Sequence, residues 1–274
     1  MVRRILRAVQ RGEISLEEAT RLLEEGHLPG GRHARFDLPR VERTGLPEVL
    51  LGEGKQLAHF QELVDGLDRT RTGAILSRLT DEEMAWLPQR RAEGVPLEVH
   101  PLARLAVLRP EEMDRPLAGR HAALLSAGTA DARIAEEVRL TLEALGAEVA
   151  CAFDVGVAGL HRLLRVLPRL QRTRPGVYVV CAGREGALAT VVAGLVDRPV
   201  IGVPTSQGYG RGGGGEAALN AMLQSCVPLA VVNIDAGIPA ALVAAQVLRS
   251  TTASGAGARR GGRRRVRARN GQRS

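Results

Sequence analysis

The stretch PVIGVPTSQGYGRGGGGEAALNAMLQSCVPLAVVNID, residues Pro199 to Asp235, contains two apolar strand patterns with a helix pattern between them. The first strand pattern is interrupted by Pro204 and is followed by a glycine-rich loop with hydroxyl side chains. The helix pattern ends near Cys226, and the second strand pattern ends on an acid. This order is typical of a βαβ unit, whose loops bind phosphorylated or acidic small molecules at the carboxyl ends of parallel strands.

The same alternation continues from this stretch toward the N-terminus as far as residue 121. Strand patterns at residues 121–125, 148–153 and 177–181 alternate with helix patterns at 134–145, 160–170 and 187–196. A final apolar helix is expected from Gly237 to Leu248. Short apolar runs that alternate with longer helix patterns predict an α/β fold with a doubly wound parallel sheet over residues 119–250.

The first 118 residues follow a different pattern. Residues 1–30 are expected to form a helical hairpin, in which Ser15 and Glu18 cap the second helix, and which serves packing or contact between copies. Residues 31–118 mix short apolar runs, at 48–51, 73–76 and 105–108, with helix patterns at 56–67 and 81–86. A small mixed α/β region is therefore predicted in front of the doubly wound sheet.

The composition favours a cytoplasmic globular protein. Of the 274 residues, 45% are apolar but only 2% are aromatic, so the core must be built from aliphatic side chains. No apolar run reaches the roughly 18 residues of a membrane span, and the first residues lack the apolar segment of a signal peptide. Three widely spaced cysteines, Cys151, Cys181 and Cys226, argue against a disulfide framework and against closely spaced zinc ligands.

The net charge of +8 comes from the C-terminal tail. Residues 255–274 contain eight arginines and no acid, so the other 254 residues are formally neutral. Residues 251–274 are predicted to be a disordered Arg/Gly-rich tail. Such a tail either grips RNA or another polyanion, or is a solvated extension without a dedicated partner, and nucleic acid is a partner only through it. The arginines are Arg259, Arg260, Arg263, Arg264, Arg265, Arg267, Arg269 and Arg273.

Candidate binding residues follow the predicted strands, because the carboxyl ends of parallel strands share one edge of the sheet. Ser126 and Thr129 offer hydroxyls beside a helix N-terminus, which suits phosphate. Asp131 repels phosphate, so it is expected either to cap the helix or to bind a sugar hydroxyl or a cation. His161, in a first helical turn, is either catalytic or a capping or packing residue.

Three further residues are candidates for chemistry. In a dry pocket the pKa of Glu185 would be raised and the residue would suit general acid or base catalysis, whereas in a first helical turn it would only favour the helix dipole. Cys226 is either a nucleophile or a small buried hydrophobe, and Cys151 and Cys181 are expected in the core. Lys55, the only lysine of the chain, is either a compact charge for a ligand or simply exposed.

The segment from Gly208 to Gly213 matches the G-x-G-x-x-G dinucleotide pattern, with Asp235 about twenty residues further on. The pattern does not follow its strand directly, and it lies in the fourth βα unit rather than the first. We therefore expect nucleotide binding without hydride transfer.

Several loop motifs taken together resemble those of a known family. They are SAGTAD (126–131), DVGVAGLH (154–161), AGREGAL (182–188), PVIGVPTS (199–206), GYG (208–210) and VNID (232–235), with LPEV (46–49) and GEGK (52–55) upstream. In this order they resemble the LarB family of nickel-pincer nucleotide cofactor biosynthesis proteins, relatives of the aminoimidazole ribonucleotide (AIR) carboxylases called PurE. The resemblance covers nearly the whole chain except the arginine-rich tail.

The resemblance implies a PurE-type fold in a homo-oligomer of octamer type. It also implies carboxylation of the pyridinium ring of nicotinic acid adenine dinucleotide at C5, and hydrolysis of the phosphoanhydride to release AMP. Cys226 matches the family's cysteine that adds to the ring, and Glu185 matches the acid that handles a proton. The implied substrate-binding residues are Ser126, Gly128, Thr129, Asp131, Asp154, Gly156, Gly159, His161, Gly183, Thr205, Ser206, Gly208, Tyr209, Gly210 and Lys55.

The implied co-substrate is CO₂ or bicarbonate, and no tightly bound cofactor or protein-held metal is expected. Mg²⁺ is an optional companion of the substrate diphosphate, and the partners are the dinucleotide, further copies of the chain and later enzymes of the nickel-pincer pathway. The sequence departs from the family at Arg184, where an apolar residue is usual, and in the extra glycines of residues 211–215.

Two other functions are compatible with the sequence. A PurE-type carboxylase acting on an aminoimidazole ribonucleotide would not need Cys226, since its substrate is already electron-rich. A nucleotide- or RNA-binding protein without enzymatic activity would depend on the tail.

Overall fold

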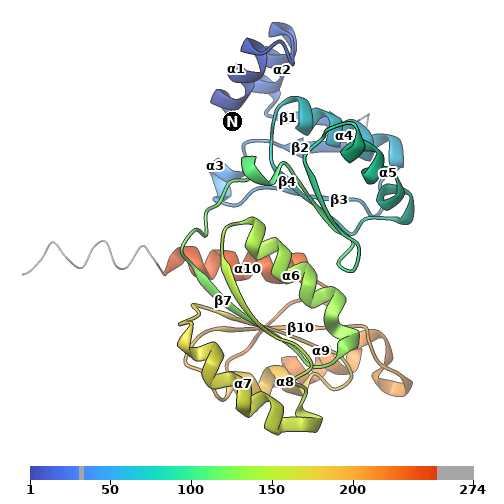
Figure 1. Cartoon of the computed structure of the whole chain (residues 1–274). Helices are drawn as coiled ribbons and strands as arrows, with labels where there is room; N and C mark the ends of the chain where they lie inside the picture. Colours follow the sequence, from blue (N-terminus) through green and yellow to red (C-terminus); the bar gives the residue numbers. More distant parts are fainter. Residues whose placement is uncertain (31–33, 252–274) are drawn as a thin grey trace, which may run out of the picture.

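The computed structural model describes residues 1–30 and 34–251 (Figure 1). Residues 31–33 and 252–274 lie outside the described residues, and with them almost all of the tail that was predicted to be disordered. Among the residues described, no helix is both long and apolar enough to cross a membrane.

The C-terminal part is a five-stranded parallel sheet with helices on both faces (Figure 1). Strands β9 and β10 are buried along their whole length, as expected of aliphatic strands covered on both faces. The doubly wound α/β fold predicted from the sequence is therefore confirmed. The strands are β7 (His121–Ser126), β8 (Glu148–Ala152), β9 (Tyr178–Ala182), β10 (Val200–Pro204) and β11 (Ala230–Val231), and the helices are α6 (Ala132–Ala144), α7 (Leu160–Arg172), α8 (Ala187–Ala193), α9 (Glu216–Leu223) and α10 (Gly237–Ser250).

The strand order is β11-β10-β9-β7-β8. The order reverses between β7 and β9, because the chain first adds β8 on one side of β7 and then continues on the other. In open α/β sheets, ligands bind outside the carboxyl ends of the strands at such a switch point. The topology thus indicates where the site should lie.

Alternate residues of one strand serve two different cores. Leu124 packs with α6 and α10 on one face of the sheet, whereas the next residue, Leu125, packs with α7 and α8 on the other. Strand β11 is shorter than the predicted strand at 231–235, although the N–H groups of Val232 and Asp235 still donate to the Gly202 and Pro204 carbonyls. Two side chains also bond to this segment. Asn233 Oδ1 accepts from the Ile234 N–H at 2.8 Å, and Asp235 Oδ1 accepts from the Ser206 N–H at 3.0 Å.

The N-terminal part contains a helical hairpin and a second, mixed sheet of order β3-β4-β6-β5. Strands β3 and β4 are parallel, and β6 is antiparallel to both of its neighbours. The sequence did not predict β5, and it did not predict the antiparallel pair of β1 and β2, whose first strand lies within residues 1–30. The elements are α1 (Val2–Gln10), α2 (Leu16–Glu25), β1 (His27–Gly30), β2 (Ala34–Asp37), α3 (Arg40–Thr44), β3 (Val49–Leu51), α4 (Leu57–Arg69), β4 (Ala74–Ser77), α5 (Asp81–Ala92), β5 (Leu97–His100) and β6 (Leu105–Leu108).

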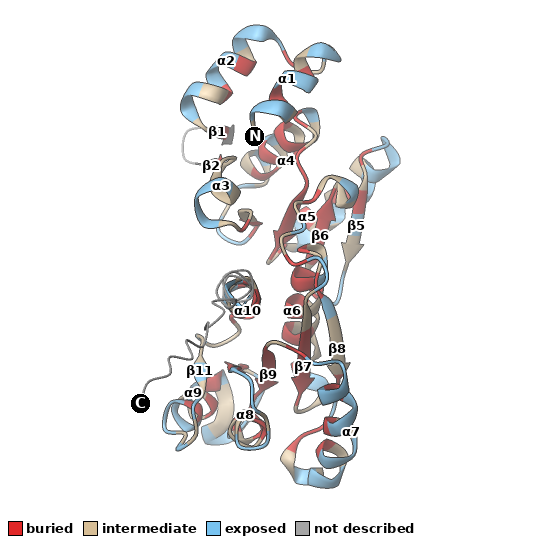
Figure 2. Ribbon diagram, turned by 90° about the vertical axis from the view of Figure 1, so that its left-hand side faces the viewer, coloured by how far each residue is buried: buried red, intermediate tan, exposed pale blue. Residues whose placement is uncertain are grey.

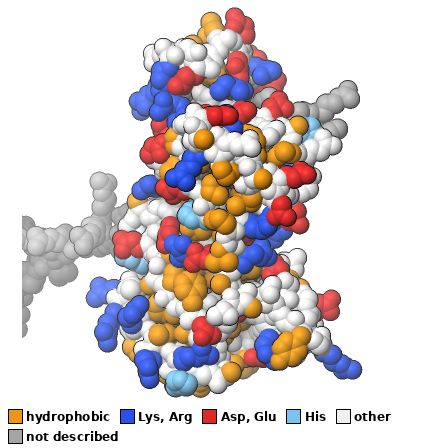
Figure 3. All heavy atoms as spheres, turned by 45° about the vertical axis from the view of Figure 1, so that its right-hand side comes forward, with side chains coloured by type: hydrophobic (Ala, Val, Ile, Leu, Met, Phe, Trp, Pro, Cys, Tyr) orange, Lys and Arg blue, Asp and Glu red, His pale blue; other side chains and the backbone are white. Residues whose placement is uncertain are grey.

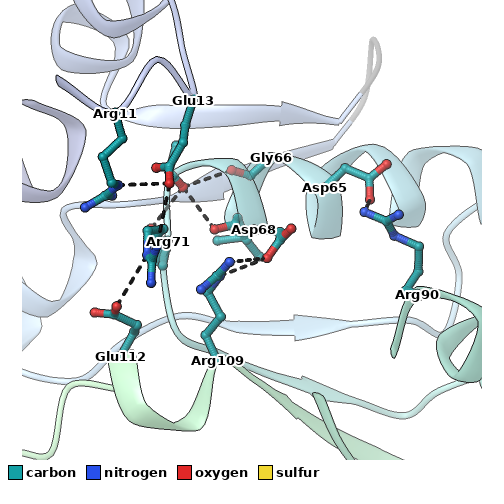
Figure 4. Close-up of polar contacts among 12 residues, drawn as sticks. Arg11, Glu13, Asp65, Gly66, Asp68, Arg71, Arg90, Arg109 and Glu112 are labelled. Carbon is teal, nitrogen blue, oxygen red and sulfur yellow. Dashed lines mark hydrogen bonds and ion pairs between the residues drawn. The ribbon is translucent and has the colours of Figure 1, made fainter. Parts of the chain in front are cut away.

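Ion pairs join the hairpin to this second sheet (Figure 4). Glu13, in the turn between α1 and α2, lies 2.9 Å from Arg11 and 3.6 Å from Arg71, just after α4. Arg71 also lies 3.6 Å from Glu112, which follows β6. The Arg11 hydrogen bond lowers the pKa of Glu13. The hairpin is thus held by charges as well as by the apolar core that it shares with α4.

Helix α6 lies between the two sheets (Figure 2). Ile134 and Val138 of α6 belong to the same apolar core as Ile75 and Val107 of the N-terminal sheet. At the same junction the buried hydroxyl of Ser77 donates to Glu137 Oε1 at 2.6 Å. The two parts of the chain are therefore packed into one continuous interior.

Candidate functional site

A cavity of about 310 Å³ lies at the switch point between β7 and β9. Loops after four strands form its walls, so the loops that the sequence predicted to meet do meet. The predicted site residues that line it are Gly128, Asp131, Gly156, Gly183, Glu185, Gly208 and Tyr209.

Asp131 ties three of these loops together. Its Oδ1 accepts hydrogen bonds from the Gly183 N–H at 3.1 Å and from the Thr205 hydroxyl at 2.5 Å, and its Oδ2 accepts from the Gly128 N–H at 2.8 Å. Burial raises the pKa of the Asp131 carboxyl, while these hydrogen bonds act in the opposite direction. Asp131 stands at the N-cap position of α6, but its side chain makes no hydrogen bond to that helix and instead accepts from Gly128 in the turn before it.

Two glycines allow the loops to approach this closely. A Cβ on Gly183 would lie 2.2 Å from the carbonyl oxygen of Gln207, and a Cβ on Gly156 would lie 2.7 Å from that of Ala127. Both distances are too short for any side chain. The glycines therefore set the width of the cavity, and a ligand inside it would face backbone groups at close range.

Two arginines lie at the rim of the cavity. Arg184 Nη2 donates to the Tyr209 hydroxyl at 2.7 Å, with the guanidinium 4.5 Å from the ring centre, and Arg162 Nη1 lies 2.5 Å from Asp154 Oδ2. Planar guanidinium groups match phosphate and carboxylate geometry. Sequence reasoning missed Arg162 because arginine is common throughout the chain. Arg184, noted above as a departure from the family, proves to be part of the wall.

Glu185 lines the cavity and is exposed. It lies before Gly186, which precedes the first residue of α8, so it is not in the first helical turn. The dry surroundings on which its expected acid–base role depended are not formed by the single chain. His161 is in the first turn of α7, exposed and outside the lining.

The other predicted loop residues support the walls or lie beside them. Ser126 is buried, and its hydroxyl oxygen accepts from the Asp154 N–H at 3.4 Å. Thr205 is buried against Asp131, and Ser206 is held by Asp235. Adjacent to the lining, without being part of it, are Thr129, Gly159 and Gly210.

Lys55 lies in the N-terminal part, away from this cavity. Its Nζ donates to the carbonyl oxygen of Leu51 at 2.7 Å, at the end of β3. Lys55 therefore bonds to the last residue of β3, and it is not part of the cavity lining.

Cys226 also lies away from the cavity. It follows α9 and precedes β11, and its neighbour Val227 faces Gly194 at the C-terminal end of α8. Glu185 lies at the other end of α8, and the seven residues of this helix span about 10 Å. The structure therefore places the two predicted catalytic residues at opposite edges of one sheet.

Cys226 nevertheless remains the exposed thiol. Burial raises the pKa of Cys151 to about 11 and raises that of Cys181 as well, so both thiols resist ionisation. Both lie in strands, as expected of core residues. Of the residues described, no group of three or more His, Cys, Asp or Glu is arranged to hold a metal ion.

Replacing Asp131 by asparagine should loosen the cavity. The amide that takes the place of the carboxylate would turn a donor toward one of three N–H or O–H donors, so we expect Asp131→Asn to lower the free energy of unfolding by about 1–3 kcal/mol. Urea unfolding of both proteins measures this difference. Asp81→Asn is the control, since Asp81 is an almost fully exposed partner of Arg104, and should change nothing measurable. An equally stable Asp131→Asn protein would show that this carboxylate does not hold the loops.

Comparison with known proteins shows the family of the part that contains the cavity. The family profile described as AIR carboxylase matches residues 121–260, which include the whole doubly wound sheet and all four cavity loops. The chain belongs to the AIR carboxylase family. A second profile, described as the LarB/PurE-like N-terminal domain, matches residues 30–111 of the same chain. Both the PurE-type fold and the resemblance to the LarB and PurE families are thereby confirmed.

Some relatives match nearly the whole chain, and others match about half of it. An uncharacterized protein of Methanocaldococcus jannaschii is 35% identical over 251 residues, covering 89% of this chain and 95% of the relative. The N5-carboxyaminoimidazole ribonucleotide mutase of the same organism is 31% identical over 131 residues, 46% of this chain and 76% of the mutase. The crystal structure of Treponema denticola PurE covers 50% of this chain and 92% of its own, with 21% identity and a TM-score of 0.38.

Proposed function

We propose that this chain is a LarB-type carboxylase and hydrolase. Its substrate would be nicotinic acid adenine dinucleotide, and its products AMP and the pyridinium mononucleotide carboxylated at C3 and C5. The observation that supports this best is the LarB/PurE-like N-terminal domain in front of an AIR carboxylase domain. The switch-point cavity, with its glycine walls and two arginines at the rim, suits a phosphorylated nucleotide with an acidic ring.

The chemistry assigned to Cys226 explains why a thiol is needed. A pyridinium carbon is electron-poor and does not attack CO₂. When Sγ bonds to the ring carbon beside C5, the ring loses its aromaticity and C5 becomes nucleophilic. C5 then bonds to CO₂, a base removes the C5 proton, and the thiolate leaves as the aromatic ring is restored. Glu185, in the cavity lining, is the base in this proposal. Water then cleaves the phosphoanhydride to release AMP.

In this proposal Cys226 comes from a second copy of the chain. Glu185 and Cys226 of one chain lie at opposite edges of the sheet, so one ring cannot reach both. The active site would combine the cavity of one copy with Cys226 of its neighbour, within an assembly of the proposed octamer type. Apolar residues near Cys226, Leu223 at 64% and Leu195 at 42% exposure, are free to be covered in such an interface.

The proposed function also accounts for the small molecules expected. CO₂ or bicarbonate is the co-substrate, and no tightly bound cofactor is needed. Mg²⁺ would be held mainly by the diphosphate oxygens of the substrate.

Incubation with nicotinic acid adenine dinucleotide, bicarbonate and magnesium, followed by mass spectrometry, tests the proposal. We expect AMP together with a mononucleotide heavier by one CO₂ than nicotinic acid mononucleotide. With ¹³C-bicarbonate the added mass should rise by one further unit. AMP without the carboxylated product would contradict the carboxylase assignment, and an unchanged dinucleotide would contradict both activities.

A PurE-type carboxylase or mutase is the second candidate. It is favoured by the 31% identity to the ribonucleotide mutase and by the absence of Cys226 from the cavity of its own chain. Turnover of an aminoimidazole ribonucleotide that is insensitive to Cys226→Ala would support it.

A further inference from the structure

A second cavity, of about 380 Å³, lies where the two sheets meet. Figure 3 shows one face of the molecule, on which basic and acidic side chains are mixed. The residues after β4, the β5–β6 turn, the first turn of α6 and the residues after β11 form its walls. The lining residues are Glu53, Arg78, Leu79, Thr80, Arg104, Arg133, Ile234 and Asp235. This second cavity shares no lining residue with the switch-point cavity.

Three arginines line the second cavity, and they are held with different strength. Arg104 is held mainly by the Leu79 carbonyl, to which its Nε donates at 2.5 Å, because its other partner, Asp81 at 2.6 Å, is almost fully exposed. Arg78 donates to the Asp235 carbonyl at 3.1 Å and lies 3.2 Å from Glu53.

Arg133 has the loosest pairing of the three. Its ion pair within the described part of the chain is to Asp235, at 3.8 Å. A guanidinium this weakly paired keeps most of its donors for another anion.

The carboxylates around the second cavity do not block an anion. Glu53 is 69% exposed, and an exposed ion pair such as Arg78–Glu53 is weak, so a phosphate that makes bidentate hydrogen bonds can displace it. Glu137, one helical turn below Arg133, is buried, and its Oε2 has no hydrogen-bond partner among the described residues. Burial raises the pKa of Glu137, while the charges of Arg78 and Arg133 act in the opposite direction.

Three of the eight described non-glycine residues with a positive φ line this cavity. Arg78, Arg104 and Asp235 adopt positive φ angles of 52°, 48° and 54°, in the left-handed region that side chains other than glycine rarely occupy. Such strain persists where the surroundings fix the residue, and it gathers at ligand sites. Two of the three residues, Arg78 and Arg104, are arginines of the second cavity.

We propose that the second cavity binds a nucleoside monophosphate. Arg133 and Arg78 bind the phosphate, while Leu79 and Ile234 contact the apolar part of the nucleoside. The proposal depends on the geometry of this cavity and not on the carboxylase assignment. If both hold, the second cavity accepts the adenylate that the reaction releases, because it lies beside the switch-point cavity across residues 205–207.

Calorimetric titration of the full chain with AMP tests the site with two substitutions of opposite effect. Arg133→Gln removes the loosest guanidinium and should weaken AMP binding at least tenfold. Asp235→Asn removes the competing carboxylate but keeps the oxygen that accepts from Ser206, and asparagine tolerates a positive φ. It should tighten AMP binding several-fold.

The matched control is Arg139→Gln. Arg139 lies on the same helix but is paired with Glu136 and Glu143 outside this cavity, and its loss changes the net charge equally. AMP affinity should be unchanged, so binding by the arginine-rich tail cancels in the comparison. Thermal unfolding checks that each variant is folded.

Three results would overturn the proposal. The first is no AMP binding by the unaltered chain. The second is a loss of AMP binding in Arg162→Gln but not in Arg133→Gln, which would place AMP in the switch-point cavity. The third is inorganic phosphate binding as tightly as AMP, which would mean that the apolar wall is not used.

Discussion

Mixed assemblies of Cys226→Ala chains and Glu185→Gln chains are expected to turn over nicotinic acid adenine dinucleotide, although neither variant does so alone. Each variant by itself lacks a reacting group and should lose roughly a thousandfold or more in turnover. In a mixed assembly, a cavity with an intact Glu185 can be paired with an intact Cys226 from a neighbouring copy. If chains combine at random in equal amounts, about one quarter of the sites contain both groups.

The fraction of restored activity distinguishes the arrangements. Co-expression of the two variants with different affinity tags, followed by tandem purification, gives assemblies that contain both. Sites built within one chain would always lack one group, so turnover would stay at the level of the single variants. Full turnover by Cys226→Ala alone would instead remove the thiol from the mechanism and favour the PurE-type candidate.

Gly183→Ala is expected to distort the wall of the switch-point cavity, although it adds only one methyl group. The new Cβ would lie 2.2 Å from the Gln207 carbonyl oxygen and 2.8 Å from the Thr205 hydroxyl. The loop after β10 must move, which also disturbs the Thr205–Asp131 hydrogen bond. Overpacking of this kind costs about 1–3 kcal/mol of unfolding free energy. Displacement of a cavity wall by about 1 Å should lower turnover by about a hundredfold.

Gly194→Ala provides the matched control for this change. Gly194 follows the same helix, α8, has a negative φ, and its nearest non-neighbouring atom to a new Cβ is 3.6 Å away. Urea unfolding should stay close to that of the unaltered chain. A Gly183→Ala protein that behaves like this control would mean that the loop after β10 is free to move without cost.

The sequence predicted the doubly wound sheet well, because its strands are continuous aliphatic runs separated by long helix patterns. The same regularity located Gly128, Gly183 and Gly208 at one edge. Cys226 could have been placed more sharply, since a residue after a helix and before a parallel strand must lie at the amino edge.

Other features depend on tertiary packing that no local pattern encodes. Asp131 follows a turn and looked like a helix cap, yet it serves loops that come 52 and 74 residues later. The second cavity exists because two sheets, each predictable in part, meet across α6. Arg133 and Arg78 become neighbours only through that contact.

The shared core around α6 has a consequence for how the chain can be divided. The AIR carboxylase profile begins at residue 121, which marks a boundary in the sequence. In three dimensions that boundary passes through the packing of Ile75 and Val107 against Ile134 and Val138. A fragment cut there would expose the apolar face of Ile134 and Val138 to water, so we expect the C-terminal part alone to be less stable than the whole chain. Side chains of the N-terminal sheet form part of the apolar core of the C-terminal part.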